Sequence, residues 1–225
     1  MIDSEGGALE IHLITRRAGV EIIRGMTRDD RDIAAFEARA GGYEGGWLGR
    51  LHQQIADRTA DLALTVAPAA QRILDVGCGT GYLLRQLDGR CPDAVELTGV
   101  DPARAMIATA RAAATGERLR WLEGTAEDLP FPEGSFDLVV STTSFDHWAD
   151  QQAGLRECAR VLAPGGWLVL TDLFSAWLGP TLVGGRRHKA RTRRRASRLL
   201  AAAGFRDAQW HDVEGVIIRA VTARR

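Results

Sequence analysis

Short hydrophobic runs alternate with helix-length amphipathic segments through the chain after Pro68. Five runs have the length and composition of buried strands: "RILDV", "ELTGV", "LRWLE", "FDLVVS" and "WLVLTD". The segments between them, such as "LLRQLDGR" and "ARAMIATARAAA", carry helical spacing. This repetition predicts a parallel sheet covered by helices on both faces, with right-handed crossovers.

The two ends of the chain follow other patterns. Near the carboxyl end, "ASRLLAAAG" predicts a helix that ends at Gly204, and "FRDAQWHDV" and "VIIRAVTA" predict an antiparallel strand pair at the sheet edge. Near the amino end, residues 10–25 alternate as two short strands around a turn. We expect residues 1–67 to form an N-terminal extension and helical cover, and residues 68–225 to form one core domain.

The cover itself shows helical spacing in "RDDRDIAAFEARA" and in "GWLGRLHQQIADRTADLALTV", with the glycine-rich hinge "GGYEGG" between them. In the second segment one hydrophobic stripe is expected to face the core. It consists of Leu48, Leu51, Ile55, Thr59 and Leu62.

Charge and cysteine content limit the class of protein. Lys and Arg total 29 and Asp and Glu total 29, so no net charge attracts nucleic acid or an anionic membrane. The cysteines Cys78, Cys91 and Cys158 are odd in number and lack C-x-x-C spacing, which predicts neither a disulfide framework nor a metal site. No stretch reaches the roughly 20 apolar residues of a membrane helix. We expect a cytoplasmic protein that does not bind the membrane; its oligomeric state stays open, a homodimer paired through residues 10–25 included.

A glycine-rich turn follows the strand that contains Asp75. Gly77, Gly79 and Gly81 lie at the carboxyl end of a parallel strand, which is where open α/β sheets bind ligands. Asp101 ends the next strand, twenty residues after Gly81, and that spacing suits a carboxylate that reaches a ribose diol. The alternative is a tight turn that needs glycine for packing alone.

The spacing of the glycines discriminates between nucleotide ligands. The dinucleotide fingerprint G-x-G-x-x-G is not met, because the third glycine comes one residue early and Tyr82 stands where that pattern requires glycine. The carboxylate at the head of "DVGCGTG" favours a ligand with an amino group or a positive charge. A nicotinamide dehydrogenase remains the alternative nucleotide-binding reading.

Four stretches together resemble the class I S-adenosylmethionine-dependent methyltransferases, in particular the ubiquinone and menaquinone biosynthesis branch. They are "DVGCGTG", "GVDPA", "GTAEDLPFPEGSFDLVVS" and "ARVLAPGGWLVLTD", and they occur in the order and at the spacing of that family. The match is close from Arg72 to Asp172. It implies an α/β, Rossmann-like fold with a seven-stranded, mostly parallel sheet, an antiparallel last strand and helices on both faces. It also implies an enzyme that binds S-adenosyl-L-methionine, releases S-adenosyl-L-homocysteine and methylates a small molecule.

The resemblance also implies roles for individual residues. Those expected to bind the cofactor are Asp75, Gly77, Cys78, Gly79, Thr80 and Gly81 at the methionine part, Asp101 at the ribose, Pro102, Met106, Thr125, Ala126 and Glu127 at the adenine, and Ser141 near the amino acid end. Pro102 and Met106 can equally be a helix start and core filler. Asp137 is expected to be a structural acid, and "LAPGG" a turn.

Residues that bind the methyl acceptor are expected after the fourth strand and in the N-terminal cover. Methyl transfer needs the acceptor held in line, and a nearby base helps when the acceptor must lose a proton. His147 in "SFDHWAD" is the candidate base, with pocket lining as its alternative role. Residues expected to bind the substrate are Tyr43, Trp47, Phe145 and Trp177, with Phe174 beside them. Trp47 can instead anchor a helix to the core.

The stretch 185–198 holds eight Lys or Arg residues and no acid. It favours three readings: a solvated helix face, a site for an acidic or phosphorylated substrate, or an RNA methyltransferase. The strand end Ser141-Thr142-Thr143-Ser144 lacks the N-P-P-Y type of motif, which disfavours methylation of nucleic acid bases. A protein that binds S-adenosylmethionine without catalysis also stays open, as do the acceptor and the methylated atom (O, N or C).

Overall fold

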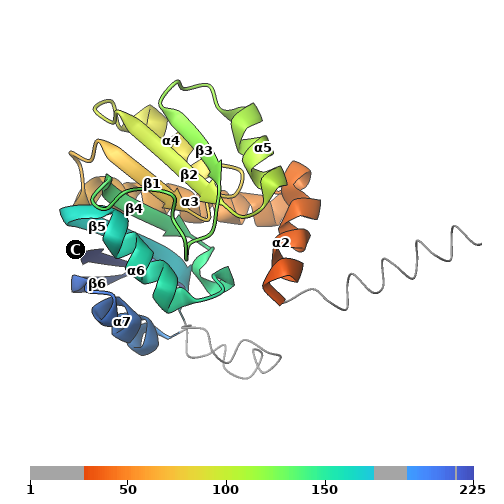
Figure 1. Ribbon diagram of the computed structural model, residues 1–225. Helices are drawn as coiled ribbons and strands as arrows, with labels where there is room; N and C mark the ends of the chain where they lie inside the picture. The colour runs from red at the N-terminus through yellow and green to blue at the C-terminus, as the bar shows by residue number, and fades with distance from the viewer. Residues whose placement is uncertain (1–27, 175–191, 216) are drawn as a thin grey trace, which may run out of the picture.

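A computed structural model of the chain describes residues 28–174, 192–215 and 217–225. Within these residues, seven strands form one sheet in the order β3-β2-β1-β4-β5-β7-β6 (Figure 1). The strands are β1 (Arg72–Val76), β2 (Glu96–Asp101), β3 (Leu119–Glu123), β4 (Phe136–Thr142), β5 (Leu162–Leu173), β6 (Arg206–Glu214) and β7 (Ile218–Arg224). Because β7 pairs antiparallel with both β5 and β6, β7 is the one strand of the seven described that runs opposite to the other six. The predicted sheet is confirmed, while the strand pair expected at 10–25 lies outside the described residues.

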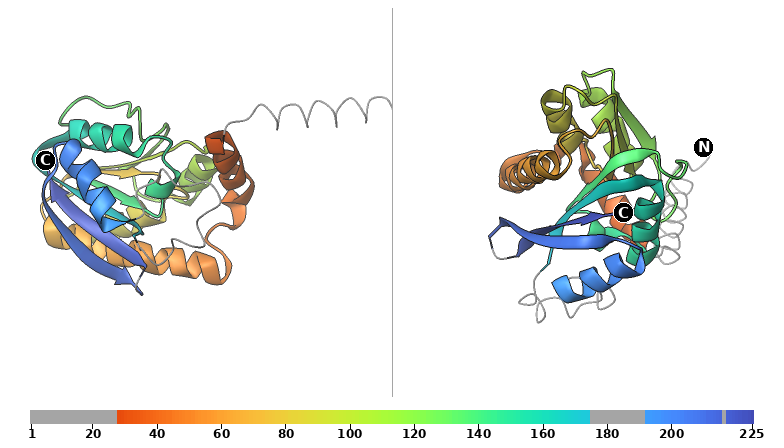
Figure 2. Two further views of the ribbon diagram at one scale, coloured as in Figure 1. Left: turned by 90° about the horizontal axis from the view of Figure 1, so that it is seen from below. Right: turned by 90° about the vertical axis from the view of Figure 1, so that its left-hand side faces the viewer.

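Helices cover both faces of the sheet (Figure 2). One face carries α3 (Gly46–Val66), α4 (Tyr82–Arg90) and α5 (Arg104–Ala113), and the other carries α6 (Gln151–Val161) and α7 (Arg193–Ala202). Each face has its own hydrophobic cluster, so the sheet lies between two cores. The cover helix α2 (Arg28–Arg39) and the 3-10 turn Ala40–Gly42 pack against α5. None of the described helices has the length and apolar content needed to cross a membrane.

The hydrophobic stripe expected on α3 is partly corrected. Ile55 and Thr59 are buried as predicted. The other buried residues of α3 are small ones such as Ala60 and Ala63. Leu48 is 43% exposed, because it faces the cleft described below instead of the core. Small side chains let the backbone of α3 approach the neighbouring helix α4 closely.

The "LAPGG" segment is also corrected, because it belongs to β5 instead of preceding it as a turn. Leu162 pairs with Phe136 of β4, and after an irregularity Trp167 pairs with Leu138. Gly165, with φ of 80°, lies in the irregular part. The extra residues form a bulge, which bends the strand without ending it.

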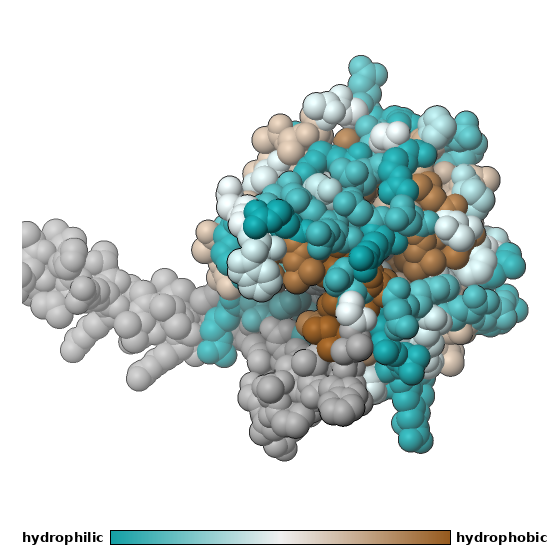
Figure 3. All heavy atoms as spheres, turned by 180° about the vertical axis from the view of Figure 1, so that it is seen from behind, coloured by the Kyte–Doolittle hydropathy of each residue, from teal (hydrophilic) through white to brown (hydrophobic). Residues whose placement is uncertain are grey.

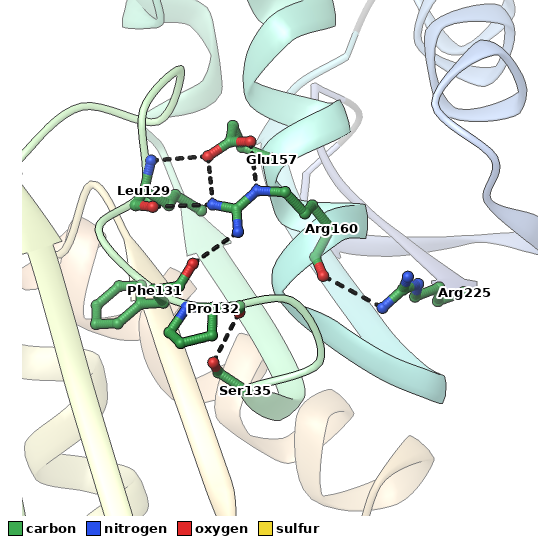
Figure 4. A network of polar contacts seen from close by, with 7 residues as sticks. All are labelled: Leu129, Phe131, Pro132, Ser135, Glu157, Arg160 and Arg225. Carbon is green, nitrogen blue, oxygen red and sulfur yellow. Dashed lines mark hydrogen bonds and ion pairs between the residues drawn. The ribbon is translucent and has the colours of Figure 1, made fainter.

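Two carboxylates tie together segments that lie far apart in the sequence. Asp137 accepts hydrogen bonds from the Gln71 and Arg72 amides and from the Arg72 guanidinium, 2.7 Å away, as a structural acid should. Burial alone would raise its pKa, yet these bonds hold the pKa of Asp137 below its ordinary value. Glu157 accepts from the Leu129 amide and from Arg160, whose guanidinium also donates to two carbonyls of the loop after β3 (Figure 4).

Candidate functional site

Three adjoining cavities open where β1, β2 and β4 end. The first encloses about 820 Å³ including the solvent at its mouth, and lies between α2, the glycine-rich turn and the loop after β3. The second lies behind that turn, against α3, and the third runs between α2, α3 and the ends of β5 and β7. Tyr43 and Thr143 line all three, so the cavities adjoin one another, and together they are called the cleft.

The three glycines of the turn are required for different reasons. All have positive φ, 75° at Gly77, 53° at Gly79 and 80° at Gly81. A Cβ on Gly77 would lie 1.9 Å from the Ser144 hydroxyl oxygen, and one on Gly81 would lie 2.3 Å from the Trp121 ring. A Cβ on Gly79 would meet nothing within 4 Å. The protein's own side chains therefore fill the space beside two glycines, and Gly79 alone of the three leaves its space open.

Asp101 ties the glycine-rich turn to the end of β2. One carboxylate oxygen accepts a hydrogen bond from the Gly79 amide and the other accepts from the Ala103 amide, each at 2.9 Å. Each oxygen keeps a lone pair for a second donor. Burial raises the pKa of Asp101 in spite of these two bonds. The side chain lines the first cavity, where a ligand with two adjacent hydroxyls would meet it.

Asp75 presents an unsatisfied carboxylate to the second cavity. Its side chain is buried, and Oδ1 has no hydrogen-bond partner among the described residues. Burial first, and then the nearby Asp101, raise the pKa of Asp75 to about 8. The Thr142 hydroxyl and the His52 Nδ1 atom belong to residues that also line this cavity, and among the described residues they are likewise buried without a partner. Such groups are costly unless a ligand satisfies them.

Most residues expected at the cofactor line the cleft. Those at the first cavity are Gly77, Gly79, Asp101, Pro102, Met106, Thr125, Ala126 and Glu127, and those at the second include Asp75, Cys78 and Thr80. Ser141 is buried beneath the cleft, where its hydroxyl donates to Ser144 at 3.4 Å. Met106 is both core and lining, because it is 1% exposed and borders the first cavity.

The residues expected to bind the substrate are divided. Tyr43 lines the cleft, and burial raises its pKa. Phe145 is 1% exposed and packs in the core against the rings of Trp148 and Phe174, away from the cleft. Trp47 is 71% exposed, which fits neither an anchor in the core nor a cavity wall. Trp177 lies outside the described residues.

His147 lies between the first and third cavities on the short helix Phe145–His147. Its Nδ1 atom is 3.4 Å from a carboxylate oxygen of Asp32 on α2. The ring of Phe36, also on α2, packs edge-on with its centroid 5.0 Å away. The cover therefore orients the imidazole at the junction of two cavities.

Several lining residues were not anticipated from the sequence. Asp32 and Phe36 come from α2, His52 from α3, and Thr143 from the end of β4. Thr143 has φ of 52°, a strained conformation for a β-branched residue. No signal in the sequence pointed to His52, because Leu48, four residues earlier on the same face of α3, was itself expected to face the core.

Glu44 fastens the cover to the glycine-rich turn. One of its carboxylate oxygens accepts from the Thr80 hydroxyl at 2.6 Å and from the Arg85 guanidinium at 2.7 Å.

The described part of the basic run belongs to α7, whose Ala196 and Leu200 are buried while Arg193 to Arg195 are exposed. That part is therefore the solvated face of an amphipathic helix, and residues 185–191 lie outside the described residues.

Comparison with known proteins agrees on one family. The family described as a methyltransferase domain matches residues 74–170. A demethylmenaquinone methyltransferase of Thermus thermophilus is 48% identical over 117 residues, which cover 51% of this chain and 52% of that protein. A malonyl-[acyl-carrier protein] O-methyltransferase of Hahella chejuensis is 32% identical, with 75% of this chain and 60% of that protein covered. The chain thus spans about half the length of the first of these relatives.

A solved structure shares the fold. It is a chain from the complex between the Trm112 methyltransferase activator of Haloferax volcanii and a methyltransferase. The TM-score is 0.69 at 22% identity, with 84% of this chain and 96% of that chain covered. At this identity the likeness concerns the arrangement of strands and helices.

Proposed function

We propose that this chain, which belongs to the class I S-adenosylmethionine-dependent methyltransferases, transfers a methyl group from S-adenosyl-L-methionine to a small-molecule acceptor. The observation that carries the proposal is a pair of carboxylates, buried Asp75 and half-buried Asp101, on either side of an open turn. Asp75 offers an unpaired oxygen to the second cavity, and Asp101 offers its remaining lone pairs to the first. Gly79 between them leaves room for a ligand.

The residues present fit this cofactor. Asp75 would hold its ammonium group, since a buried carboxylate without a partner is matched by a positive charge. Asp101 would accept from the two ribose hydroxyls, and the segment Thr125 to Glu127 would border the adenine together with Met106. When bound, the cofactor supplies a methyl group that is already activated by a positively charged sulfur.

The chain then contributes to the reaction in two ways: it positions the methyl acceptor, and it removes a proton from it. A cleft that holds the acceptor in line supplies much of the acceleration by orientation. His147 would accept a proton from the acceptor at Nε2, while Asp32 faces Nδ1 and stabilises the imidazolium that forms. The proton then leaves to solvent, which reaches the half-buried His147 side chain.

The third cavity supports a small and mainly apolar acceptor. Its lining includes six aliphatic side chains, Leu48, Leu51, Ile55, Leu173, Ile217 and Ile218. Hydrophobic residues gather among hydrophilic ones on the surface seen from behind (Figure 3). One relative is named as a demethylmenaquinone methyltransferase, which is consistent with a small-molecule acceptor. The exposed arginines of α7 do not line this cavity, so they give the RNA alternative no support.

Calorimetry tests the proposal directly. S-adenosylhomocysteine should bind the wild-type protein, and NADH should not. Asp101→Ala should weaken the affinity for S-adenosylhomocysteine by at least about 10- to 100-fold, because each hydrogen bond to a charged group is worth about 1.5 to 3 kcal/mol. Arg193→Ala on the exposed face of α7 is the matched control and should bind normally. Binding of NADH alone, or full affinity in Asp101→Ala, would refute the proposal.

A further inference from the structure

His52 has an unused polar atom at the boundary between two cavities. It lies on α3 and lines both the second and the third cavity. Its ring stacks on Tyr43, with centroids 5.2 Å apart and an angle of 25° between the planes. The Nδ1 atom is buried and has no hydrogen-bond partner among the described residues. Leaving such an atom unpaired costs about 1 to 3 kcal/mol, so its placement indicates a partner from outside the chain.

The surroundings keep this imidazole neutral. Burial, and then the positive charge of Arg39 on α2, hold the pKa of His52 below its ordinary value. The other titratable groups that line the third cavity are Tyr43, Asp146, His147, Asp172 and Glu214. A neutral imidazole has one nitrogen that donates and one that accepts, so it suits an uncharged polar group.

We propose that His52 binds the methyl acceptor, through a hydrogen bond between Nδ1 and a hydroxyl group on an otherwise apolar, planar molecule in the third cavity. This rests on the proposed function, because it names the acceptor side of the same cleft. The cofactor has another partner for its ammonium group, the unpaired oxygen of Asp75. Tyr43 and His52, whose rings stack on each other, both line the third cavity, so an aromatic pair borders the space where a planar molecule would lie.

The test uses 2-naphthol, a neutral and planar probe with one hydroxyl group, on protein saturated with S-adenosylhomocysteine. No methyl group is then transferred, so calorimetry measures binding alone. His52→Ala should bind 2-naphthol about 5- to 10-fold more weakly than the wild type, which is the loss of one hydrogen bond. His52→Asn, which keeps a polar atom near the position of Nδ1, should recover most of that affinity. The affinity for S-adenosylhomocysteine should stay unchanged in both variants.

His211 provides a matched control. Burial lowers its pKa as it does for His52, but the ring lies on β6 next to Thr222 and lines none of the three cavities. His211→Ala should therefore bind both ligands as the wild type does. Histidine labelled with ¹⁵N gives a second readout that needs no substitution at His52. Its ring signals should shift when 2-naphthol is added to the wild-type protein, even if His52→Ala does not fold.

Four results would overturn the assignment of His52. They are a wild type that does not bind 2-naphthol, equal 2-naphthol affinity in His52→Ala, unmoved ring signals of His52, and a loss confined to S-adenosylhomocysteine. The last would place His52 at the cofactor instead. A wild type that binds 2-naphthol through His52 but not S-adenosylhomocysteine would contradict the proposed function, and it would leave His52 as a ligand contact that is not an acceptor contact.

Discussion

Asp75→Asn should make the ligand-free protein less sensitive to pH. The carboxyl group has a pKa of about 8 in the folded protein against 3.8 ordinarily, so the folded state binds more protons than the unfolded state between those values. Stability therefore falls as the pH rises through this window. The proton occupancy of this group, integrated from pH 6 to pH 8, is about 1.7 pH units. The free energy of unfolding therefore falls by about 2 kcal/mol over this range. Asparagine does not ionise, and its own packing cost is the same at both pH values.

The assay is urea unfolding of ligand-free wild type and Asp75→Asn at pH 6 and at pH 8. The free energy of unfolding of the wild type, relative to the variant, should fall by about 2 kcal/mol between the two pH values. Identical pH dependence in both proteins would refute the claim that Asp75 is held in a desolvated site.

The same group predicts proton release on ligand binding. At pH 7 a carboxyl group with a pKa of about 8 is about nine-tenths protonated, and an ammonium ligand requires the ionised form. Binding of S-adenosylhomocysteine should thus release about 0.9 proton from this site. Calorimetry in buffers with different ionisation enthalpies measures the number. Asp75→Asn should show weaker binding and no release from this group.

Two further predictions concern the base and the turn. His147→Ala should lower the turnover of an accepted substrate about 100-fold, the lower end of the range for removing a general base, while the affinity for S-adenosylhomocysteine is spared. Asp32→Asn should lower turnover less and shift the pH profile, and full activity in both variants would reduce His147 to cavity lining. Gly81→Ala should destabilise the fold by about 2 to 4 kcal/mol in urea unfolding, because it combines positive φ with a clash against Trp121. A loss under 1 kcal/mol would show that Trp121 moves aside at little cost.

The sequence predicted the features that depend on local pattern. The strands, the glycine-rich turn and the position of Asp101 follow from hydrophobic runs and from spacing along the chain, and the carboxyl ends of parallel strands meet at one edge. These rules placed Asp75 and Asp101 along the same cleft, and the resemblance to the methyltransferase family added the loop at Thr125. They also indicated that glycine was required at Gly77 and Gly81.

The remaining features depend on how distant segments pack. The sequence gives no register between α2 and the end of β4, so the contact of Asp32 with His147 was not foreseen. For the same reason Phe145 was assigned to the cleft, although its side chain points into the core. The reason for glycine at Gly81 is the ring of Trp121, which lies on β3, forty residues further along the chain.

The most direct measurement is a crystal structure of the protein with S-adenosylhomocysteine bound. The account predicts both ribose hydroxyls within hydrogen-bond distance of Asp101 and the amino group of the ligand at Asp75. It would be contradicted by density for the ligand away from this cleft, or by a ribose that leaves the Asp101 carboxylate bonded to the backbone alone.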